Sequence, residues 1–309
     1  MTSQSIADDS ARGWANLPAA YEIPEVAPSE AEAREYCRRL ARSHYENFSV
    51  ATWFLPKRLR QHFFNVYAYC RISDDLGDEA GDPSVSLRLL DEWQAELDAC
   101  YAGSPRHPVF VALAETVHTC KIPKHEFSDL LTAFRQDQTT PRYATFQDLL
   151  GYCKNSANPV GHLVLYICGY GDQERQRLSD FTCTALQLAN LWQDVSVDYA
   201  KGRVYLPLED LRRFGVAESD IAAQRNTPPF REMMKFEVDR AREWFQQGLP
   251  LTGRVGREFA IDIELFSRGG QEILNAIERQ GFAVLGHRPV ISKGRKLALV
   301  ARAALGKLV

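Results

Sequence analysis

Two pairs of aspartates at helical spacing are the residues of this sequence best suited to chemistry. Asp74 and Asp78 (the first pair) are four positions apart, and so are Asp194 and Asp198 (the second pair). On an α-helix, side chains four residues apart lie one above the other on the same face. Each pair therefore predicts two carboxylates separated by one helical turn.

Such carboxylate pairs indicate a magnesium site that acts on a phosphorylated substrate. Mg²⁺ prefers hard oxygen ligands, keeps several waters, and is commonly held by one or two carboxylates together with substrate phosphates. Two such helices could grip a diphosphate through bridging metal ions, which neutralise the leaving group as a carbon–oxygen bond breaks. We therefore expect a Mg²⁺-dependent enzyme that ionises a diphosphate.

Acidic clusters near helix ends are more often solvated faces than metal sites, so the surroundings of each pair matter. The second pair ends a polar stripe that begins at Gln187 and passes through Asn190. The residues beside this stripe are apolar: Leu186, Leu188, Ala189, Leu191, Trp192, Val195 and Val197. A helix that is apolar over most of its surface is buried. A polar stripe there is costly unless it lines a cavity or binds ions, which favours the metal site.

Helical periodicity extends over nearly all of the chain that must position these residues. Ser29-x-x-Glu32 has the form of a capping box, and most later segments repeat apolar residues with a period of about 3.6. Prolines such as Pro83 and Pro108 stand where helices are expected to begin. No segment alternates as a strand would before a hairpin turn. We predict an irregular N-terminal arm over residues 1–28 and one all-α domain over residues 29–309.

Composition and charge narrow the classes of function. The 309 residues are 45% apolar and 25% charged with a net charge of −3, which suits a globular protein and argues against a nucleic-acid partner. The seven cysteines are dispersed and never form C-x-x-C, as expected of reduced thiols. Neither a signal peptide nor an apolar run of about 18 residues is present. We therefore expect a soluble, cytoplasmic protein.

Around both pairs the sequence resembles the squalene/phytoene synthase family, whose members are all-α prenyl transferases. The resemblance extends over residues 35–300. It rests on four segments: His44 with Asn47-Phe48-Ser49, Tyr67-x-x-x-Arg71-x-x-Asp74-Asp75-x-x-Asp78, Gln187-x-x-Asn190-x-x-x-Asp194-x-x-x-Asp198, and Lys201-Gly202-Arg203-Val204-Tyr205-Leu206-Pro207. It implies an isoprenoid-synthase (terpenoid-synthase) helical bundle around a central cavity.

The resemblance also implies a role for each matching residue. Mg²⁺, or Mn²⁺ in its place, would be coordinated by Asp74, Asp78, Asn190, Asp194 and Asp198. The diphosphate would be held by His44, Tyr67, Arg71 and Arg203, with help from Arg288, Lys293 or Lys296. Tyr152 and Gln187 would line the reaction cavity, and Tyr152 would act in catalysis with the four aspartates. His44 could equally be an ordinary helix histidine, and the C-terminal cations could be surface charges.

Three departures from the usual family pattern point to one branch. Gln193 stands where an arginine is usual, Asn158 falls in a stretch of small residues, and Gly270 replaces an aromatic residue. These features most resemble the branch of bacterial hopanoid biosynthesis that makes hydroxysqualene. That branch implies that presqualene diphosphate is ionised, rearranged and trapped by water without NADPH. Asn158 or its neighbours would help to place the water.

Other functions fit the same motifs. A presqualene diphosphate synthase, or a squalene or phytoene synthase, would join two prenyl diphosphates head-to-head. A non-catalytic assembly protein on the same fold is disfavoured because all four aspartates are present. From Arg279 to Val309 the chain has seven Lys or Arg and no acid. These cations could touch anionic lipid headgroups, line the diphosphate site or face water, so peripheral membrane contact and partner enzymes of the squalene pathway are expectations here.

Overall fold

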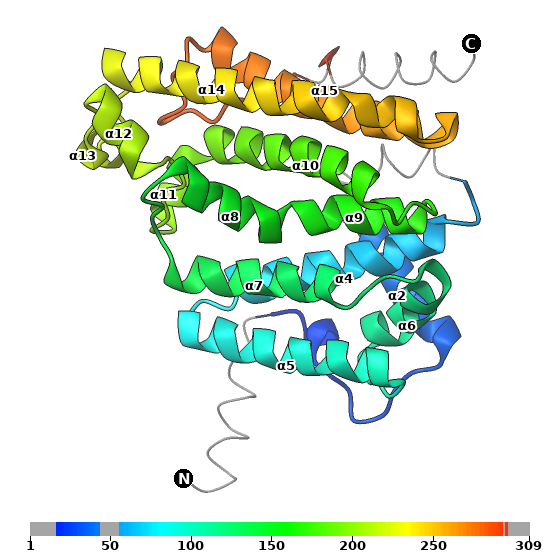
Figure 1. Cartoon of the computed structure of the whole chain (residues 1–309). Coiled ribbons are helices and arrows are strands. Elements are labelled where there is room, and N and C mark those ends of the chain that lie inside the picture. Colours follow the sequence, from blue (N-terminus) through cyan, green and yellow to red (C-terminus); the bar gives the residue numbers. More distant parts are fainter. Residues whose placement is uncertain (1–16, 44–55, 293, 296–309) are drawn as a thin grey trace, which may run out of the picture. The chain divides into compact units, whose positions relative to one another are not determined.

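The computed structural model of the chain describes residues 17–43, 56–292 and 294–295. Within these ranges the regular elements are helices, and the β-type pairing is one isolated bridge between Arg142 and Val204. The prediction of an all-α fold is therefore confirmed (Figure 1).

The chain divides into two compact units, residues 1–139 with 163–170 and residues 140–162 with 171–309. The first aspartate pair belongs to the first unit and the second pair to the second. The single domain expected over residues 29–309 stays a prediction.

The first unit is built from five described helices and a short 3₁₀ turn. These are η1 (Ala19–Tyr21), α2 (Glu30–Ser43), α4 (Arg60–Asp78), α5 (Pro83–Ala102), α6 (Pro108–Cys120) and α7 (His125–Thr139). The predicted capping box opens α2, because the Ser29 backbone N–H donates to Glu32 Oε2 at 2.9 Å. Pro83 and Pro108 are the first residues of their helices, as predicted.

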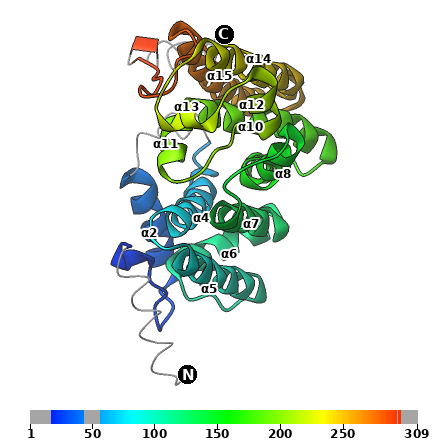
Figure 2. The same cartoon turned by 90° about the vertical axis from the view of Figure 1, so that its left-hand side faces the viewer.

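Helix α4, which carries the first aspartate pair, is surrounded within its unit by α2, α5, α6 and α7 (Figure 2). Tyr69 is fully buried, and its ring meets those of Phe110 and Phe127 edge-on at 5.8 and 4.9 Å. Trp93 Nε1 donates to Ser73 Oγ at 3.0 Å. These contacts fix the rotation of α4 about its axis, and so they decide where its aspartates point.

The second unit, like the first, is built from helices in its described part. Its described helices are α8 (Phe146–Ser156), α10 (Gln173–Gln193), α11 (Val195–Ala200), α12 (Leu208–Phe214), α13 (Glu218–Ala222), α14 (Pro228–Gly248), η2 (Leu249–Arg254) and α15 (Arg257–Arg279). Helix α9 (Asn158–Ile167) contains residues of both units. Helix α10 lies against α14 and α15 in both views (Figure 1; Figure 2).

Gly270 on α15 marks a close approach of three helices. A Cβ added there would lie 2.5 Å from Phe245 Cζ on α14 and 2.6 Å from Leu186 Cδ2 on α10. Such distances are far below van der Waals contact, so any side chain at position 270 would force the Phe245 ring and the Leu186 methyl group to move. Phe245 is almost fully buried, and its ring occupies the space that a side chain at position 270 would need. This explains why an aromatic residue is absent at position 270.

A second buried feature is the Glu237–Asp210–Arg240 cluster. Glu237 has no exposed surface, and Arg240 NH1 donates to Asp210 Oδ2 at 3.0 Å and to Glu237 Oε2 at 3.3 Å. Burial, opposed by Arg240 and aided by Asp210, raises the pKa of the Glu237 carboxyl to about 9. Glu237 is therefore protonated at neutral pH.

Gly270→Ala should lower the free energy of unfolding by about 1–3 kcal/mol, because its methyl group overlaps the Phe245 ring. In a Phe245→Leu background the same substitution should cost less, since the smaller side chain leaves room. Urea denaturation of the two single variants and the double variant measures this coupling. Equal costs in both backgrounds would contradict the packing argument.

The Glu237 cluster predicts a pH-dependent stability. The pKa of this carboxyl is raised from 4.5 in the unfolded chain, so its contribution is fully present below pH 4.5 and is lost as the pH rises towards 9. The slope is at most about 1.4 kcal/mol per pH unit. Glu237→Gln keeps the neutral shape and should remove this contribution. The difference in unfolding free energy between variant and parent, measured from pH 5 to 9, should therefore move in favour of the variant; a constant difference would contradict the assignment.

Candidate active site

The first aspartate pair lies in the last turns of α4. The helical hydrogen bonds continue beyond it, since the Glu79 backbone N–H donates to Asp75 O at 2.8 Å. Asp74 and Asp78 are therefore one turn apart on one face, as their spacing predicts. Asp74 is exposed and Asp78 half-buried, so both carboxylates lie at the surface of this unit. Tyr67 and Arg71 lie on the preceding turns of the same stripe.

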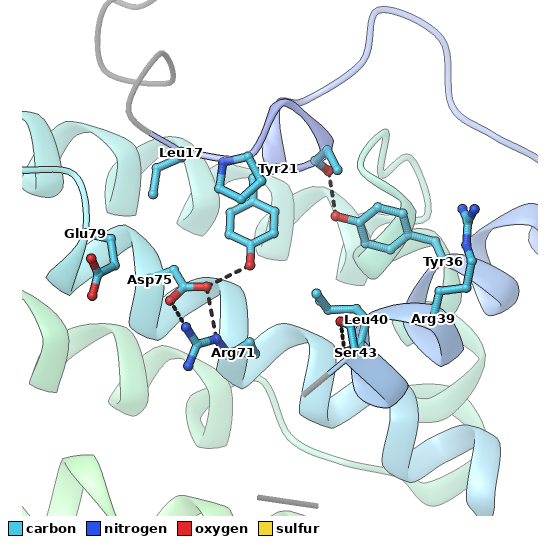
Figure 3. Close-up of a pocket in the computed structure, with 11 residues that line it drawn as sticks. Leu17, Tyr21, Tyr36, Arg39, Leu40, Ser43, Arg71, Asp75 and Glu79 are labelled. Atoms are coloured by element: carbon cyan, nitrogen blue, oxygen red, sulfur yellow. Dashed lines mark hydrogen bonds and ion pairs between the residues drawn. The ribbon is translucent and has the colours of Figure 1, made fainter. Parts of the chain in front are cut away.

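Arg71 is held by the carboxylate of Asp75, a residue for which no role was predicted. Its Nε donates to Asp75 Oδ2 at 3.0 Å, and its NH2 group donates to Asp75 Oδ1 (Figure 3). Its NH1 lies 3.8 Å from Asp74 Oδ2. This two-point pairing fixes the plane of the guanidinium beside the first pair.

The N-terminal arm supplies a third member of this cluster. The Tyr21 hydroxyl donates to Asp75 Oδ2 at 2.7 Å, and Tyr21 is only 4% exposed. Burial, together with the adjacent Asp75 carboxylate, raises the pKa of Tyr21, so the hydroxyl keeps its proton and remains a donor. The described part of the arm is irregular apart from η1, yet it is docked, because Leu17 and Tyr21 are both buried.

A pocket of about 750 Å³ opens beside this cluster within the first unit (Figure 3). Its wall is formed by the arm, α2 and α4, through residues that include Leu17, Tyr21, Tyr36, Arg39, Leu40 and Arg71. The Tyr36 hydroxyl donates to Ala20 O at 2.5 Å and so ties the arm to α2. Among the residues that the structure describes, Arg71 is the one that this pocket shares with the predicted site.

The second aspartate pair lies where α10 passes into α11. Asp194 is the residue between the two helices, with φ −104° and ψ 12°. The helical hydrogen bonds nevertheless continue, from Asp194 N–H to Asn190 O and from Asp198 N–H to Asp194 O, each at 2.9 Å. Asn190, Asp194 and Asp198 therefore stay stacked on successive turns. Of their apolar neighbours, Leu188 and Trp192 are fully buried, as the pattern predicted. Val197, on the short helix α11, was expected to be buried as well but is 45% exposed.

The chain beyond α15 returns to the second pair within the second unit. The Arg288 guanidinium donates through Nε to Asp194 Oδ1 and through NH2 to Asp194 Oδ2, the latter at 2.9 Å. The same NH2 donates to Gln193 Oε1 at 3.2 Å. Gln193 Nε2 in turn donates to Pro289 O at 2.5 Å. The predicted helper Arg288 thus lies at the second pair, in contact with one of its aspartates.

Tyr152 of α8 is 5% exposed and belongs to a cluster of three tyrosine rings. Its ring centroid lies 5.6 Å from that of Tyr143 and 5.3 Å from that of Tyr205. Tyr205 follows the second pair in the basic segment, as does Arg203, whose backbone N–H donates to Asp198 O at 2.9 Å. The structure therefore brings Tyr152 to this segment.

Asn158 is 9% exposed and accepts a hydrogen bond from Thr184 Oγ1 at 3.0 Å. Nearby, a Cβ on Gly161 would lie 2.2 Å from Ser179 Oγ and 2.5 Å from Cys183 Sγ. The start of α9 is therefore pressed onto α10, which carries the polar stripe, and the Asn158 carboxamide is fixed on this surface.

The donor groups suit a metal that is completed by its substrate. Among the residues that the structure describes, no three His, Cys, Asp or Glu side chains are grouped as an all-protein metal site. Each motif instead offers two hard carboxylates one turn apart, which fits Mg²⁺ bound together with waters and phosphate oxygens. The metal and substrate roles of the residues named above stay predictions.

Three of the predicted substrate-binding residues, His44, Lys293 and Lys296, lie outside the described residues, as does the amphipathic segment 297–308. None of the helices described is long and apolar enough to cross a bilayer.

Sequence reasoning missed two contributions to this site. Tyr21 lies in an arm without periodicity, and nothing in its local sequence indicates a bond to a residue 54 positions later. Gln193 was identified only as a departure from the family pattern. Its role in holding the C-terminal segment was missed, because its partner Pro289 comes 96 residues later in the sequence.

Comparison with known proteins agrees with this architecture. The crystal structure of squalene synthase HpnC from Alicyclobacillus acidocaldarius superposes with a TM-score of 0.78 at 46% identity, covering 87% of this chain and 98% of that one. A dehydrosqualene synthase in complex with ligand superposes with a TM-score of 0.81 at 25% identity, covering 89% and 96%. The fold is therefore that of the isoprenoid synthases, as predicted.

Relatives identified by sequence lead to the same group. The 15-cis-phytoene synthase of Synechocystis sp. is 30% identical over 297 residues, which cover 89% of this chain and 87% of that protein. The sequence profile of squalene/phytoene synthases matches residues 41–295, a range that includes both aspartate pairs. The chain therefore belongs to the squalene/phytoene synthase family.

Proposed function

We propose that this enzyme uses Mg²⁺ to ionise presqualene diphosphate and releases hydroxysqualene. The observation that carries the proposal is that both carboxylate pairs keep one-turn spacing, even where α10 gives way to α11. The 46% identity to a squalene synthase HpnC supports this branch of the family. Bound Mg²⁺ would stabilise the negative charge of the departing diphosphate.

The chain's own cations would share that task. Arg71, Arg203 and Arg288 stay charged at neutral pH, and a guanidinium meets two phosphate oxygens at once. Arg71 is held in one orientation by Asp75, which is itself held by Tyr21. A guanidinium whose orientation is fixed beforehand loses less freedom when the diphosphate binds.

The carbon framework would then rearrange and be captured by water. The bond from carbon to the diphosphate oxygen breaks with both electrons leaving on oxygen, and the cyclopropylcarbinyl cation rearranges. A water oxygen forms the new carbon–oxygen bond and loses a proton. Neither carbon nor phosphorus is reduced overall, so NADPH is not needed. The ring faces of Tyr152 and its two neighbours are suited to stabilise a cation without reacting with it.

Asn158 is our candidate for placing the water. Its carboxamide is almost buried and is oriented by Thr184, so its position is fixed before the substrate arrives. A polar group at this place would hold water near the cation, whereas an apolar residue would exclude it.

Head-to-head joining of two prenyl diphosphates is the second candidate. It is favoured by the identity of 30% to a 15-cis-phytoene synthase and of 25% to a dehydrosqualene synthase. Both candidates use the same two aspartate pairs and differ in the substrate and in the fate of the cation. A non-catalytic assembly role predicts that neither substrate is consumed.

Product analysis separates these functions. The purified protein should convert presqualene diphosphate to an alcohol when Mg²⁺ is present, and EDTA should abolish the reaction. Asp78→Asn and Asp198→Asn should each lower kcat/KM by about 100-fold or more, because each removes one carboxylate charge from a metal site. Consumption of farnesyl diphosphate, with presqualene diphosphate or a hydrocarbon as product, would instead support the second candidate.

The same assay tests whether Asn158 places the water that captures the cation. Asn158→Leu should shift the product from alcohol towards hydrocarbons that arise by loss of a proton, while the rate of diphosphate release falls less. Gas chromatography with mass spectrometry measures the products, and released diphosphate measures ionisation. An unchanged alcohol fraction would exclude Asn158 from this role.

Tyr21→Phe should weaken substrate binding through Arg71. Loss of the hydroxyl leaves the buried Asp75 carboxylate with one donor fewer, which should cost about 1–2 kcal/mol of stability and loosen Arg71. We expect KM to rise about three- to tenfold with a smaller change in kcat. Tyr36→Phe is the matched control, because it also frees the arm but removes a bond to Ala20 O. Equal KM values in the two variants would show that Tyr21 acts only by anchoring the arm.

A further inference from the structure

The contact between Arg288 and the second aspartate pair has a consequence for metal binding. The guanidinium occupies both oxygens of the Asp194 carboxylate, since Nε contacts Oδ1 and NH2 contacts Oδ2. The resemblance to the family assigns this same carboxylate to Mg²⁺. A divalent cation and a guanidinium repel each other, and each would need the same oxygens. Arg288 in this position and a metal ion on Asp194 therefore compete for the same carboxylate.

The Arg288–Asp194 ion pair is exposed enough for Arg288 to be replaced on Asp194 by another cation. The Arg288 side chain is 49% exposed and that of Asp194 is 25% exposed, so water competes with the pair and keeps it weak. A fully buried pair could not be opened at low cost, because each partner would be left as an uncompensated buried charge. Asp194 holds the guanidinium through both of its oxygens, and an arginine side chain stays charged at neutral pH. The positive charge is therefore always present.

The chain before Arg288 is anchored independently of this pair. The Gly286 backbone N–H donates to Gln224 Oε1 at 2.5 Å and to Ser196 Oγ at 3.1 Å. The Leu285 backbone N–H donates to Asn226 Oδ1 at 3.1 Å. When the side chain leaves Asp194, these bonds keep Arg288 within reach of whatever binds at the second pair.

Gln193 explains why the contact forms in this chain. It is 6% exposed, accepts from Arg288 through Oε1 and donates to Pro289 O through Nε2. An arginine at this position would have no acceptor to offer and would repel Arg288. The uncharged Gln193 carboxamide can accept from Arg288 and donate to Pro289 at the same time, so it holds this segment against the second pair.

We propose that Arg288 is a counter-ion of Asp194 that is exchanged when the ligands bind. Gln193 positions Arg288 on Asp194. When a divalent cation and diphosphate bind, the Arg288 side chain leaves Asp194 and contacts the diphosphate. The inference rests on the proposed function and adds the order in which Arg288 contacts Asp194 and then the diphosphate. Without diphosphate, Arg288 competes with the metal for Asp194. With diphosphate, the released guanidinium strengthens binding of the anion. Gln193 is a positioning residue in this scheme.

Removal of Arg288 should therefore act in opposite directions on the two ligands. Binding of Mn²⁺, followed by the loss of the electron paramagnetic resonance signal of the free ion, reads metal affinity without turnover. Arg288→Gln should bind Mn²⁺ alone about three- to tenfold more tightly than the parent protein. In saturating Mn²⁺, the same variant should bind inorganic pyrophosphate about three- to tenfold more weakly by calorimetry. Gln193→Met should shift Mn²⁺ affinity in the same direction by a smaller factor.

Arg295→Gln is the matched control. It removes one positive charge from the same C-terminal segment, and Arg295 pairs with Glu272 at 3.3 Å rather than with an aspartate of the second pair. The control should leave Mn²⁺ affinity unchanged. Equal shifts in the Arg288 and Arg295 variants, or no shift in the Arg288 variant while the parent binds Mn²⁺ with pyrophosphate, would overturn this inference alone. Failure of every protein to bind Mn²⁺, with or without pyrophosphate, would overturn the proposed metal chemistry as well.

Discussion

Repulsion between carboxylates one turn apart is the constraint on which both motifs depend. Like charges at this spacing destabilise a helix by about 0.2–0.5 kcal/mol, and burial of the flanking residues strengthens the repulsion. In each motif an arginine reduces this repulsion by pairing with the carboxylates. Arg71 lies beside Asp74 and Asp75, and Arg288 pairs with Asp194. Arginine suits this task because it stays charged and bonds a carboxylate at two points. Part of the positive charge that the two motifs need is thus carried by the chain itself.

Neutralisation is useful only if the carboxylates are held still, and this depends on packing. Helices α4 and α10 are each surrounded by other helices of their own unit. Aromatic rings lock α4, whereas at α10 a glycine on α15 lets helices approach without room for a methyl group. Polar stripes on such helices cannot rotate away from their site. The chemistry is therefore positioned by the residues on the other faces of the same helices.

Local patterns predicted most of this arrangement. The spacing of the aspartates and the Ser29 capping box act through neighbours within a turn or two, and both appear as expected. Most apolar flanks of the second stripe are buried too, but Val197 is exposed. The joint after Gln193 was not predicted, because Asp194 leaves helical geometry without a proline or glycine to mark it. The roles of Tyr21 and Gln193 depend on partners distant in sequence, which periodicity does not encode. The space at Gly270 likewise depends on how three helices pack.

The docked arm has a practical consequence for how the protein can be engineered. Tyr21 precedes the first long helix of the described chain, in a segment that sequence inspection alone would mark as dispensable. A truncation at residue 29 would leave every described α-helix intact and still strip a donor from Asp75, along with one wall of the pocket beside it. A shortened enzyme of normal helicity could therefore be impaired for reasons that a circular-dichroism spectrum would not reveal. Affinity tags and fusion partners are better joined ahead of Leu17, where the described contacts begin.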